Sequence, residues 1–385
     1  MQIPRKLSLC AAFLLLVAAP IFAASSHYVI ANDDVPPKLP TGASLYSIAS
    51  DGSLSLKTVV RTGGNGVAAG LFGVQRVAVL NDTAQHCAWI SNAQTNSIVG
   101  FPINTLKATK PFEGSKTDDG SVNGIGLAVN ANYLYAGFTT SSTIGTFQVK
   151  PGCKLQFLGD TSVLGLQQGS VDGMALNGNM MVVTYGDGSI ESFDISGGVP
   201  VSNNDEQNST ASKGASWPSG IDITQDGHFA IFGDVATATI VEVSDLSTGK
   251  LGKTVVYHLG PNLSSATVRL SPDESMLYIA NTQGGQVMAS FFDKATGKIS
   301  NGCSSRRLRG YSKDYAYLGT IMTQTGNGRG GDLYVAEYGA PSSIGVVQMK
   351  MSGGKCTLTE SAKSPVADSD SPGLLSIAVY PPRSF

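Results

Sequence analysis

Two sets of polar residues recur at the ends of short apolar stretches along this chain of 385 residues. Those that begin one kind of stretch are Gln75, Asn123, Asp172 and Ser219. Those that close a second kind are Asn32, Asn92, Asp234, Asn281 and Glu337. If the stretches are strands that meet at one end of a repeating fold, we expect these side chains to line a ligand site there. The alternative is that they only cap turns, which Asn and Asp side chains do well.

Carboxylates beside an arginine at such a site would suit hydrolysis by an activated water. An Asp or Glu can act as the general base on water, and an arginine can stabilise the oxyanion. We select Glu337 and Asp234 as candidate bases and Arg76 as the candidate oxyanion group. The histidines do not predict a nucleophilic triad, because His86 and His228 precede stretches of the second kind and therefore fall at the opposite end.

Arginines offer a second chemistry, the binding of an anionic ligand. Arg306, Arg307 and Arg309 lie within four positions of one loop, and guanidinium forks suit carboxylates or phosphates. A solvated charge cluster is the alternative. Arg269 and Asp222 occupy the same column of consecutive repeats, so we expect an ion pair between them, and Arg269 is also a candidate ligand contact.

Other ligand chemistries leave weaker signals. Trp217 could stack on a sugar or an aromatic ligand, or could serve as a packing anchor. Oxygen atoms of Asn, Asp and Glu suit a hard cation such as calcium. No His or Cys spacing predicts zinc, and no Gly-Lys motif predicts a phosphate cradle. We therefore expect no cofactor, with calcium as the alternative.

An internal repeat in the sequence predicts the strands that position these residues. Seven phrases such as "VQRVAVL" from 74, "PSGIDITQ" from 218 and "LLSIAVY" from 374 share one pattern. They align one apolar column, which consists of Val77, Ile125, Met174, Ile221, Val268, Ile321 and Ile377. A second phrase, such as "AWISN" or "LYIAN", follows each of the first six. Paired strands that repeat about every 50 residues are typical of a β-propeller with four strands per blade.

The two ends of the chain supply the seventh blade. The phrase "YVIAN" at 28–32 has no partner of the first kind before it, and the terminal "LLSIAVY" has none of the second kind after it. We therefore expect the C-terminal strand to pair with the N-terminal blade and close the ring. The sequence predicts an all-β, seven-bladed β-propeller with four antiparallel strands per blade, spanning residues 24–385.

The blade pattern resembles a known family. Stretches such as "LYSIASDGSLSL" and "SPDESMLYIANTQGGQVMASFFDKATGKIS" are similar to the seven-bladed lactonase-like propellers, the group of 6-phosphogluconolactonase and the YVTN-type surface repeats. The resemblance implies this fold over nearly the whole chain after residue 23, and a lactonase activity. Family enzymes begin an inner strand with Pro-Arg-His, whereas Pro218, Ser219 and Gly220 keep only the proline.

Two functions remain open. The first is a secreted, non-catalytic propeller that binds a small anionic or sugar-like ligand, or a protein partner, at the loop-rich mouth of the channel. The second is a hydrolase of a sugar or carboxylic lactone. The departure from Pro-Arg-His and the export signal favour the first, since fold does not fix activity.

The N-terminus indicates export. Arg5 and Lys6 precede the apolar run "LCAAFLLLVAA", and small residues follow at Ala23 and Ala24, so we expect a signal peptide over 1–23 that is cleaved near Ala23 and a secreted or periplasmic protein. Without the signal peptide the formal charge changes from −2 to −4, because 26 basic residues become 24 against 28 acidic ones. We expect no nucleic-acid partner, no membrane span and a monomer.

Four cysteines remain after the signal peptide, and four allow three disulfide connectivities. Cys87 and Cys153 fall on the same side of adjacent blades, which favours a bond between them. Cys303 lies about six residues further along its outer strand than Cys356 does, so we expect a bond between these two to be difficult. Free thiols are the alternative.

Overall fold

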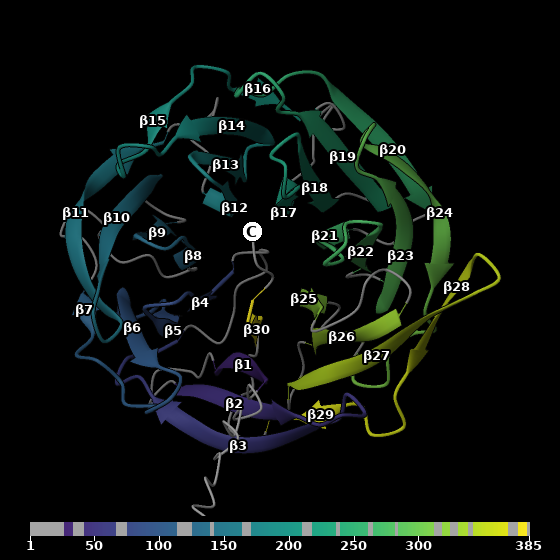
Figure 1. Cartoon of the computed structure of the whole chain (residues 1–385), viewed down its shortest axis with the longest axis horizontal. Helices are drawn as coiled ribbons and strands as arrows, with labels where there is room; N and C mark the ends of the chain where they lie inside the picture. The colour runs from purple at the N-terminus through teal and green to yellow at the C-terminus, as the bar shows by residue number, and fades with distance from the viewer. Residues whose placement is uncertain are drawn as a thin grey trace, which may run out of the picture.

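The computed structural model describes residues 27–33, 42–66, 75–113, 125–138, 142–163, 171–209, 218–235, 239–260, 265–281, 284–311, 318–323, 330–337, 342–368 and 376–382. Within these ranges every regular element is a β-strand, and the strands form seven antiparallel sheets arranged in a ring (Figure 1). The fold predicted from the repeat, a seven-bladed β-propeller, is therefore confirmed. The predicted signal peptide lies outside the described residues.

The blades follow one another along the chain, and each runs from the channel outward. Blade 1 consists of β4 (Val77–Asn81), β5 (His86–Asn92), β6 (Ser97–Pro102) and β7 (Phe112–Glu113). Blade 2 consists of β8 (Ile125–Val129), β9 (Tyr133–Phe138), β10 (Thr143–Lys150) and β11 (Lys154–Ser162). Blade 3 consists of β12 (Val171–Asn177), β13 (Met180–Tyr185), β14 (Ser189–Asp194), β15 (Val201–Ser202) and β16 (Gln207–Asn208). Blade 4 consists of β17 (Pro218–Ile223), β18 (Phe229–Val235), β19 (Thr239–Asp245) and β20 (Thr254–Gly260).

The remaining blades complete the ring. Blade 5 consists of β21 (Ser265–Leu270), β22 (Met276–Asn281), β23 (Gln286–Asp293) and β24 (Lys298–Ser304). Blade 6 consists of β25 (Leu318–Thr323), β26 (Gly330–Glu337), β27 (Ser343–Ser352), β28 (Lys355–Glu360) and β29 (Val366–Ala367). Blade 7 consists of β30 (Ile377–Tyr380), β1 (Tyr28–Asp33), β2 (Gly42–Ile48) and β3 (Leu54–Arg61). In blade 3 the short strands β15 and β16 share the fourth position, and in blade 6 β28 shares it with the two-residue strand β29, because both strands of each set pair with the third strand.

Blade 7 joins the two ends of the chain. The innermost strand β30 pairs antiparallel with β1, with Ala378 opposite Ile30 and Tyr380 opposite Tyr28. The Asn32 backbone N–H donates to the Ser376 carbonyl at 3.0 Å and extends this ladder by one bond. The predicted closure is confirmed, and it gives β1 a strand partner on both of its edges, β2 and β30.

The core lies between the blades. Side chains on the two faces of each sheet pack against the neighbouring sheets, as Trp89 of blade 1 does against Phe138 and Phe147 of blade 2. Five residues of the predicted apolar column are buried, namely Val77, Ile125, Ile221, Val268 and Ile377, and Met174 is half-buried. The side chain of Ile321 is not among those that the structure describes. The column therefore marks interblade packing, which is why every repeat keeps an apolar residue there.

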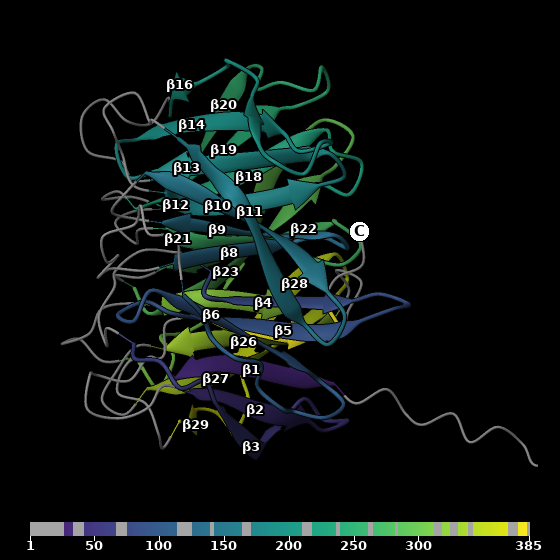
Figure 2. The ribbon, with the colours of Figure 1, turned by 90° about the vertical axis from the view of Figure 1, so that its left-hand side faces the viewer.

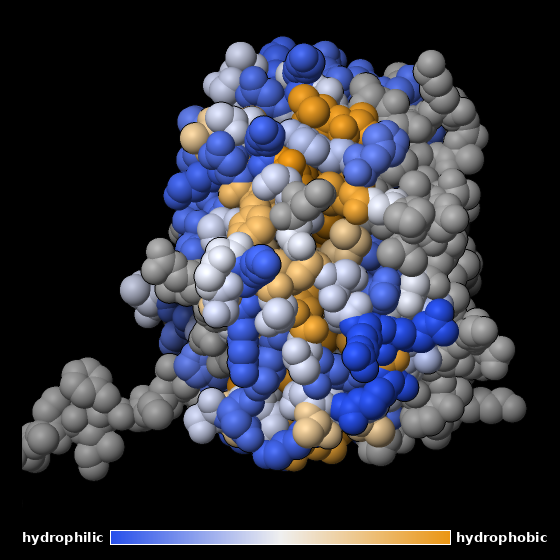
Figure 3. All heavy atoms as spheres, turned by 90° about the vertical axis from the view of Figure 1, so that its right-hand side faces the viewer, coloured by the Kyte–Doolittle hydropathy of each residue, from blue (hydrophilic) through white to orange (hydrophobic). Residues whose placement is uncertain are grey.

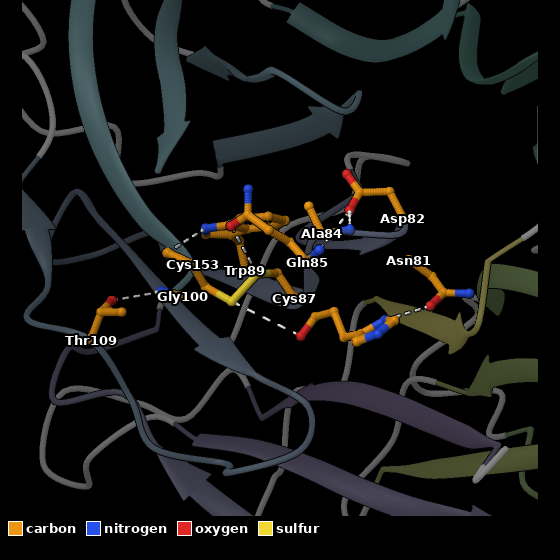
Figure 4. Close-up of a disulfide and its surroundings, with 10 residues drawn as sticks. Asn81, Asp82, Ala84, Gln85, Cys87, Trp89, Gly100, Thr109 and Cys153 are labelled. Carbon is orange, nitrogen blue, oxygen red and sulfur yellow. Dashed lines mark hydrogen bonds between the residues drawn. A yellow bond between two sulfur atoms is a disulfide. The ribbon is translucent and has the colours of Figure 1, made fainter. Parts of the chain in front are cut away.

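Two disulfides connect neighbouring blades. Cys87 of β5 is bonded to Cys153, which directly precedes β11, with the Cα atoms 5.6 Å apart. The indole Nε1 of Trp89 donates to the Cys153 carbonyl at 3.0 Å and fixes the same turn against blade 1 (Figure 4). The bond favoured by the sequence is confirmed.

The expectation that a bond between Cys303 and Cys356 would be difficult is wrong. They form a disulfide between blades 5 and 6, with the Cα atoms 5.7 Å apart. The expectation assumed that adjacent outer strands run in register, but outer strands cross the blades obliquely, as β11 does in Figure 2. The start of β28 therefore lies over blade 5, where the Cys356 Sγ lies 4.0 Å from the carbonyl of Ala289, the partner of Cys303 in the sheet.

The outer surface is mainly hydrophilic on the side that Figure 3 shows, where hydrophobic residues form a narrow strip between hydrophilic ones. A search of the described residues finds no helix with the length and apolar character that a membrane crossing requires.

Replacing both Cys87 and Cys153 with serine should lower the free energy of unfolding by about 2–4 kcal/mol, because the crosslink restricts the unfolded chain. Urea unfolding followed by tryptophan fluorescence measures the change, with the Cys303→Ser/Cys356→Ser pair as the matched variant. An unfolding midpoint equal to that of the wild type would contradict the expectation.

Candidate functional site

The polar residues selected from the sequence come to one end of their blades. Asp234 pairs with Pro218, Asn281 with Ser265, and Glu337 with Leu318, so that the end of each second strand meets the start of each first strand. Asn32 and Asn92 occupy the same position in blades 7 and 1, next to Ser376 and Arg76. We call this end of the central channel the mouth. The residues meet there because the first and second strands of a blade are antiparallel, so that the start of one lies beside the end of the other.

Most of these side chains are buried between blades and do not face an open cavity. Asn32, Asn92, Ser219, Asp234, Asn281 and Glu337 are 0% exposed, and Arg76 and Asp172 are 1% exposed. Asn32 Nδ2 of blade 7 donates to the Ser91 carbonyl of blade 1 at 3.3 Å. Ser91 Oγ in turn donates to the Ile125 carbonyl of blade 2 at 2.9 Å.

The same kind of interblade hydrogen bond recurs around the ring. Thr184 Oγ1 of blade 3 donates to the Ser219 carbonyl of blade 4 at 3.0 Å. Ser265 Oγ of blade 5 donates to the Asp234 carbonyl of blade 4 at 3.3 Å. The Arg76 backbone N–H of blade 1 donates to Ser376 Oγ of blade 7 at 3.0 Å. Polar residues at these strand ends therefore join adjacent blades.

Asn92 illustrates why burial limits a ligand role. Its Oδ1 accepts from Thr62 Oγ1 at 2.7 Å, and its Nδ2 donates to Ser97 Oγ at 3.1 Å. The segment after β3 covers it so closely that a Cβ built at Gly64 would lie 2.5 Å from Asn92 Nδ2. Both polar atoms of the amide are thus occupied within the protein.

Arg269 reaches across the channel. It belongs to β21 of blade 5, and its Nη2 donates to Oε1 of Gln75, which precedes blade 1 on the other side of the ring, at 2.5 Å (Figure 1). Its Nη1 donates to the Ile221 carbonyl at 3.3 Å and lies 3.8 Å from Asp222 Oδ1. The predicted pairing of Arg269 with Asp222 is confirmed.

Asp222 holds this guanidinium in place. Its Oδ2 accepts from the Leu270 backbone N–H at 2.9 Å and its Oδ1 from the Ile223 N–H at 3.0 Å. The Asp222 side chain is 6% exposed, whereas that of Arg269 is 20% exposed. A fixed, partly accessible guanidinium in the channel is a ready contact for a carboxylate or phosphate.

Glu337 is a buried carboxyl with one open oxygen. Oε2 accepts from Ser343 Oγ at 2.6 Å, while Oε1 has no hydrogen-bond partner among the described residues. Two glycines surround it, and a Cβ at Gly310 would lie 1.9 Å from Oε2. Burial raises the pKa of Glu337 to about 7, although the nearby charge of Arg309 opposes the rise. Near neutral pH this side chain can therefore gain or lose a proton.

The arginine loop packs along blades 5 and 6. Arg309 lies 3.3 Å from Glu360 Oε1 through its Nε, and the backbone N–H of Arg309 donates to Glu360 Oε2 at 3.0 Å. Arg307 lies over the ring of Tyr311, 5.3 Å from its centroid. Arg306 is exposed. Only part of the cluster thus keeps its charge free of an ion pair, and the predicted ligand contacts Asn123 and Trp217 lie outside the described residues.

Several polar features carried no clear sequence signal. Tyr185 OH donates to Glu191 Oε2 at 2.9 Å inside blade 3, and burial raises the pKa of Glu191. Asp33 is buried beside Asp368, although it directly follows the selected Asn32 and could have been found in the motif "YVIAND". On the face opposite the mouth, a groove of about 530 Å³ between blades 3 and 4 includes His228, Asp226 and Asn177.

Comparison with known proteins extends the fold assignment. No protein-family model matches this chain. No curated protein sequence matches it either. Among solved structures, a periplasmic gluconolactonase from Pseudomonas aeruginosa is similar with a TM-score of 0.68 and 12% identity over 92% of this chain and 99% of that one. A Bacteroides uniformis protein to which a 6-phosphogluconolactonase activity has been attributed has a TM-score of 0.70 and 12% identity, over 92% and 100% of the two chains.

A third solved structure has a different description. A hypothetical selenium-binding protein from Sulfolobus tokodaii reaches a TM-score of 0.68 with 9% identity, over 92% of this chain and 93% of that one. These likenesses show that the chain shares its propeller fold with these structures. Because proteins described by different activities share it, the fold alone does not decide the chemistry.

Glu337→Gln should change how stability depends on pH. The pKa of Glu337 is raised in the folded state, so the protonated side chain contributes to the free energy of unfolding below pH 4.5. This contribution, at most about 3 kcal/mol, is lost as the pH rises through 7. At pH 8 the variant should therefore unfold at higher urea than the wild type, with little difference at pH 5. Asp194→Asn, at an exposed carboxyl whose pKa is lowered, is the control. If the urea midpoints of the wild type and Glu337→Gln changed with pH in the same way, the result would contradict a raised pKa at Glu337.

Proposed function

We propose that this protein is an exported lactonase-like propeller that binds a small anionic ligand of the sugar-acid type at the mouth of its channel, without turning it over. The observation that carries this proposal is the guanidinium of Arg269 in the channel. An aldonate offers a carboxylate for the arginine fork and hydroxyls for the polar strand ends around it.

The position of Arg269 supports an anionic ligand in three ways. Asp222 and the Ile221 carbonyl fix the guanidinium from one side. Another of its contacts is the neutral amide oxygen of Gln75, which a carboxylate can replace with a stronger, charge-assisted bond. The exposure of its side chain, 20%, leaves an approach from the channel.

The disulfide bonds agree with an exported location. Two disulfides connect blades 1 and 2 and blades 5 and 6. Such bonds persist in oxidising compartments and are rare in the cytosol of most organisms. The N-terminal sequence features of a signal peptide point the same way.

Lactone hydrolysis is the second candidate, and Glu337 favours it. A carboxyl with a pKa of about 7 and one open oxygen has the properties of a general base. Against this candidate, Glu337, Asp234 and Arg76 are each at most 1% exposed, and a substrate would reach Glu337 only after the segment around Gly310 moved.

Isothermal titration of residues 24–385 with D-gluconate, 6-phosphogluconate and neutral D-glucose tests the binding proposal. We expect the wild type to bind at least one of the two anions and Arg269→Gln to weaken that binding about 10- to 100-fold, because a charge-assisted fork is lost. Lys154→Gln, at an exposed lysine of the outer strand β11, is the matched control and should bind as the wild type does.

The variant Gln75→Ala separates a ligand role of Arg269 from a structural one. It keeps Arg269 and Asp222 and removes only the amide that occupies the guanidinium, so anion binding should be retained or strengthened. Equal anion binding by Arg269→Gln and the wild type would overturn the proposed site. Binding of glucose but neither anion would overturn the ligand class.

A panel of sugar and aliphatic lactones, followed by the pH change on hydrolysis, decides between binding and catalysis. We expect turnover by the wild type to equal that of the Glu337→Gln/Asp234→Asn variant. Turnover that disappears in the variant, with a rate that rises as the pH passes 7, would instead establish the hydrolase and assign its base to these carboxyls.

A further inference from the structure

The groove between blades 3 and 4 has the size of a small-molecule site. Its volume of about 530 Å³ falls within the range of about 300–1,000 Å³ that such sites occupy. One wall is the turn between β12 and β13 of blade 3, and the other is the turn between β17 and β18 of blade 4. None of the described residues that line it belongs to the mouth, so a ligand here would bind independently of Arg269.

The floor of the groove is apolar. Met180, Phe193 and Leu246 line it beneath the polar turns. Phe193 and Leu246 are each 1% exposed, and Met180 is half-buried. Methylene groups of a ligand can pack on such a floor while its polar ends reach the walls.

Two amide side chains are fixed so that their oxygen atoms remain as acceptors. Asn177 Nδ2 donates to the carbonyls of Thr224 and Gln225, the second at 3.0 Å. Asn203 Nδ2 donates to Ser192 Oγ at 2.8 Å. Because carbonyl oxygens only accept, the nitrogen of Asn177 must face the opposite wall, and its Oδ1 is left as an acceptor.

Two carboxylates line the same groove. Asp194 ends β14, and the Ser196 backbone N–H donates to its Oδ1 at 2.8 Å, which lowers the pKa of Asp194. Asp226 lies in the turn after β17. Burial opposes its ionisation, but hydrogen bonds from the Thr224 hydroxyl and the His228 backbone lower the pKa of Asp226. Both groups therefore favour the charged form.

The side chains that line the groove carry a net negative charge when His228 is neutral. No lysine or arginine is among the described residues of the lining. Lys250 lies beside it, where its Nζ donates to the Asn203 carbonyl at 2.9 Å, and Lys294 acts on Asp226 from blade 5. His228 Nδ1 lies 3.3 Å from Asp226 Oδ2 and so faces that carboxylate. The groove is thus opposite in character to the mouth, and an anion is disfavoured in it.

We propose that this groove binds a linear aliphatic amine with two or more ammonium groups, that is, a diamine or polyamine. An ammonium group has three donors and no acceptor, which matches fixed amide and carboxylate oxygens that only accept. A polyol matches them less well, because each of its hydroxyls also needs a donor. Asp194 of blade 3 and Asp226 of blade 4 offer each end of the ligand a carboxylate, and the apolar floor suits the methylenes between them.

Isothermal titration of the full chain with putrescine and spermidine at pH 8 tests this proposal. We expect both amines to bind, and the uncharged butanediol of the same length as putrescine not to bind. Asp194→Asn and Asp226→Asn should each weaken amine binding about 2- to 5-fold, because exposed charge pairs contribute modestly, and the double variant about tenfold.

Asp82→Asn is the matched control. It removes the same charge from the corresponding turn of blade 1, where Asp82 Oδ1 accepts from the backbone N–H groups of Ala84 and Gln85, and it should bind amines as the wild type does. No heat from either amine with the wild type would overturn the proposal, whether or not the variants fold. Equal weakening by Asp82→Asn would mean general charge attraction only, and butanediol binding as tight as that of putrescine would overturn the ligand class.

The proposal does not rest on the anion site at Arg269, and the same variants keep the two apart. Asp194→Asn/Asp226→Asn should leave gluconate binding as it is in the wild type, and Arg269→Gln should leave spermidine binding unchanged. Loss of spermidine binding in Arg269→Gln would place the amine in the channel and overturn the groove as its site.

Discussion

The pairing of β30 with β1 is the interaction on which the other features of this protein depend. Four residues at the C-terminal end complete a sheet whose other three strands come from the N-terminal end. Without that ladder, blade 7 would lack its inner strand and blades 1 and 6 would each lose a packing face, since the core lies between sheets. Each blade is packed between two neighbours, and this holds for blades 1 and 6 only when blade 7 closes the ring.

The same requirement for closure explains the polar mouth. Strand ends carry backbone groups that no further strand satisfies, and the interior there is too dry for unpaired groups. Asn32, Ser91, Thr184 and Ser265 each donate to a carbonyl of a neighbouring blade and so join the sheets where their ladders stop. The mouth is therefore first a structural seam, and Arg269 is one of the few charged side chains there that stay partly exposed, at 20%.

Burial has opposite consequences for the charged groups near this seam. Asp222 receives two backbone N–H donors and a guanidinium neighbour, so its charge is well supported. Glu337 and Asp33 have fewer donors, and burial raises the pKa of each. A carboxyl that is buried with few donors favours its protonated form, which is why the pKa of both groups rises.

The sequence by itself determined the architecture, because interblade packing demands an apolar residue at one position of every repeat and seven such positions are legible from Val77 to Ile377. It also determined the closure and the proximity of Asp222 and Arg269, since repeat register fixes which residues become neighbours. The tertiary structure alone decided which polar residues are accessible, because the loop that covers Asn92 and the Gly310 segment that covers Glu337 each follow the preceding blade. It alone decided the disulfide between Cys303 and Cys356 and the proximity of Asp33 and Asp368, since the oblique course of outer strands and the packing of blade 7 on blade 6 produce no periodic pattern in the sequence.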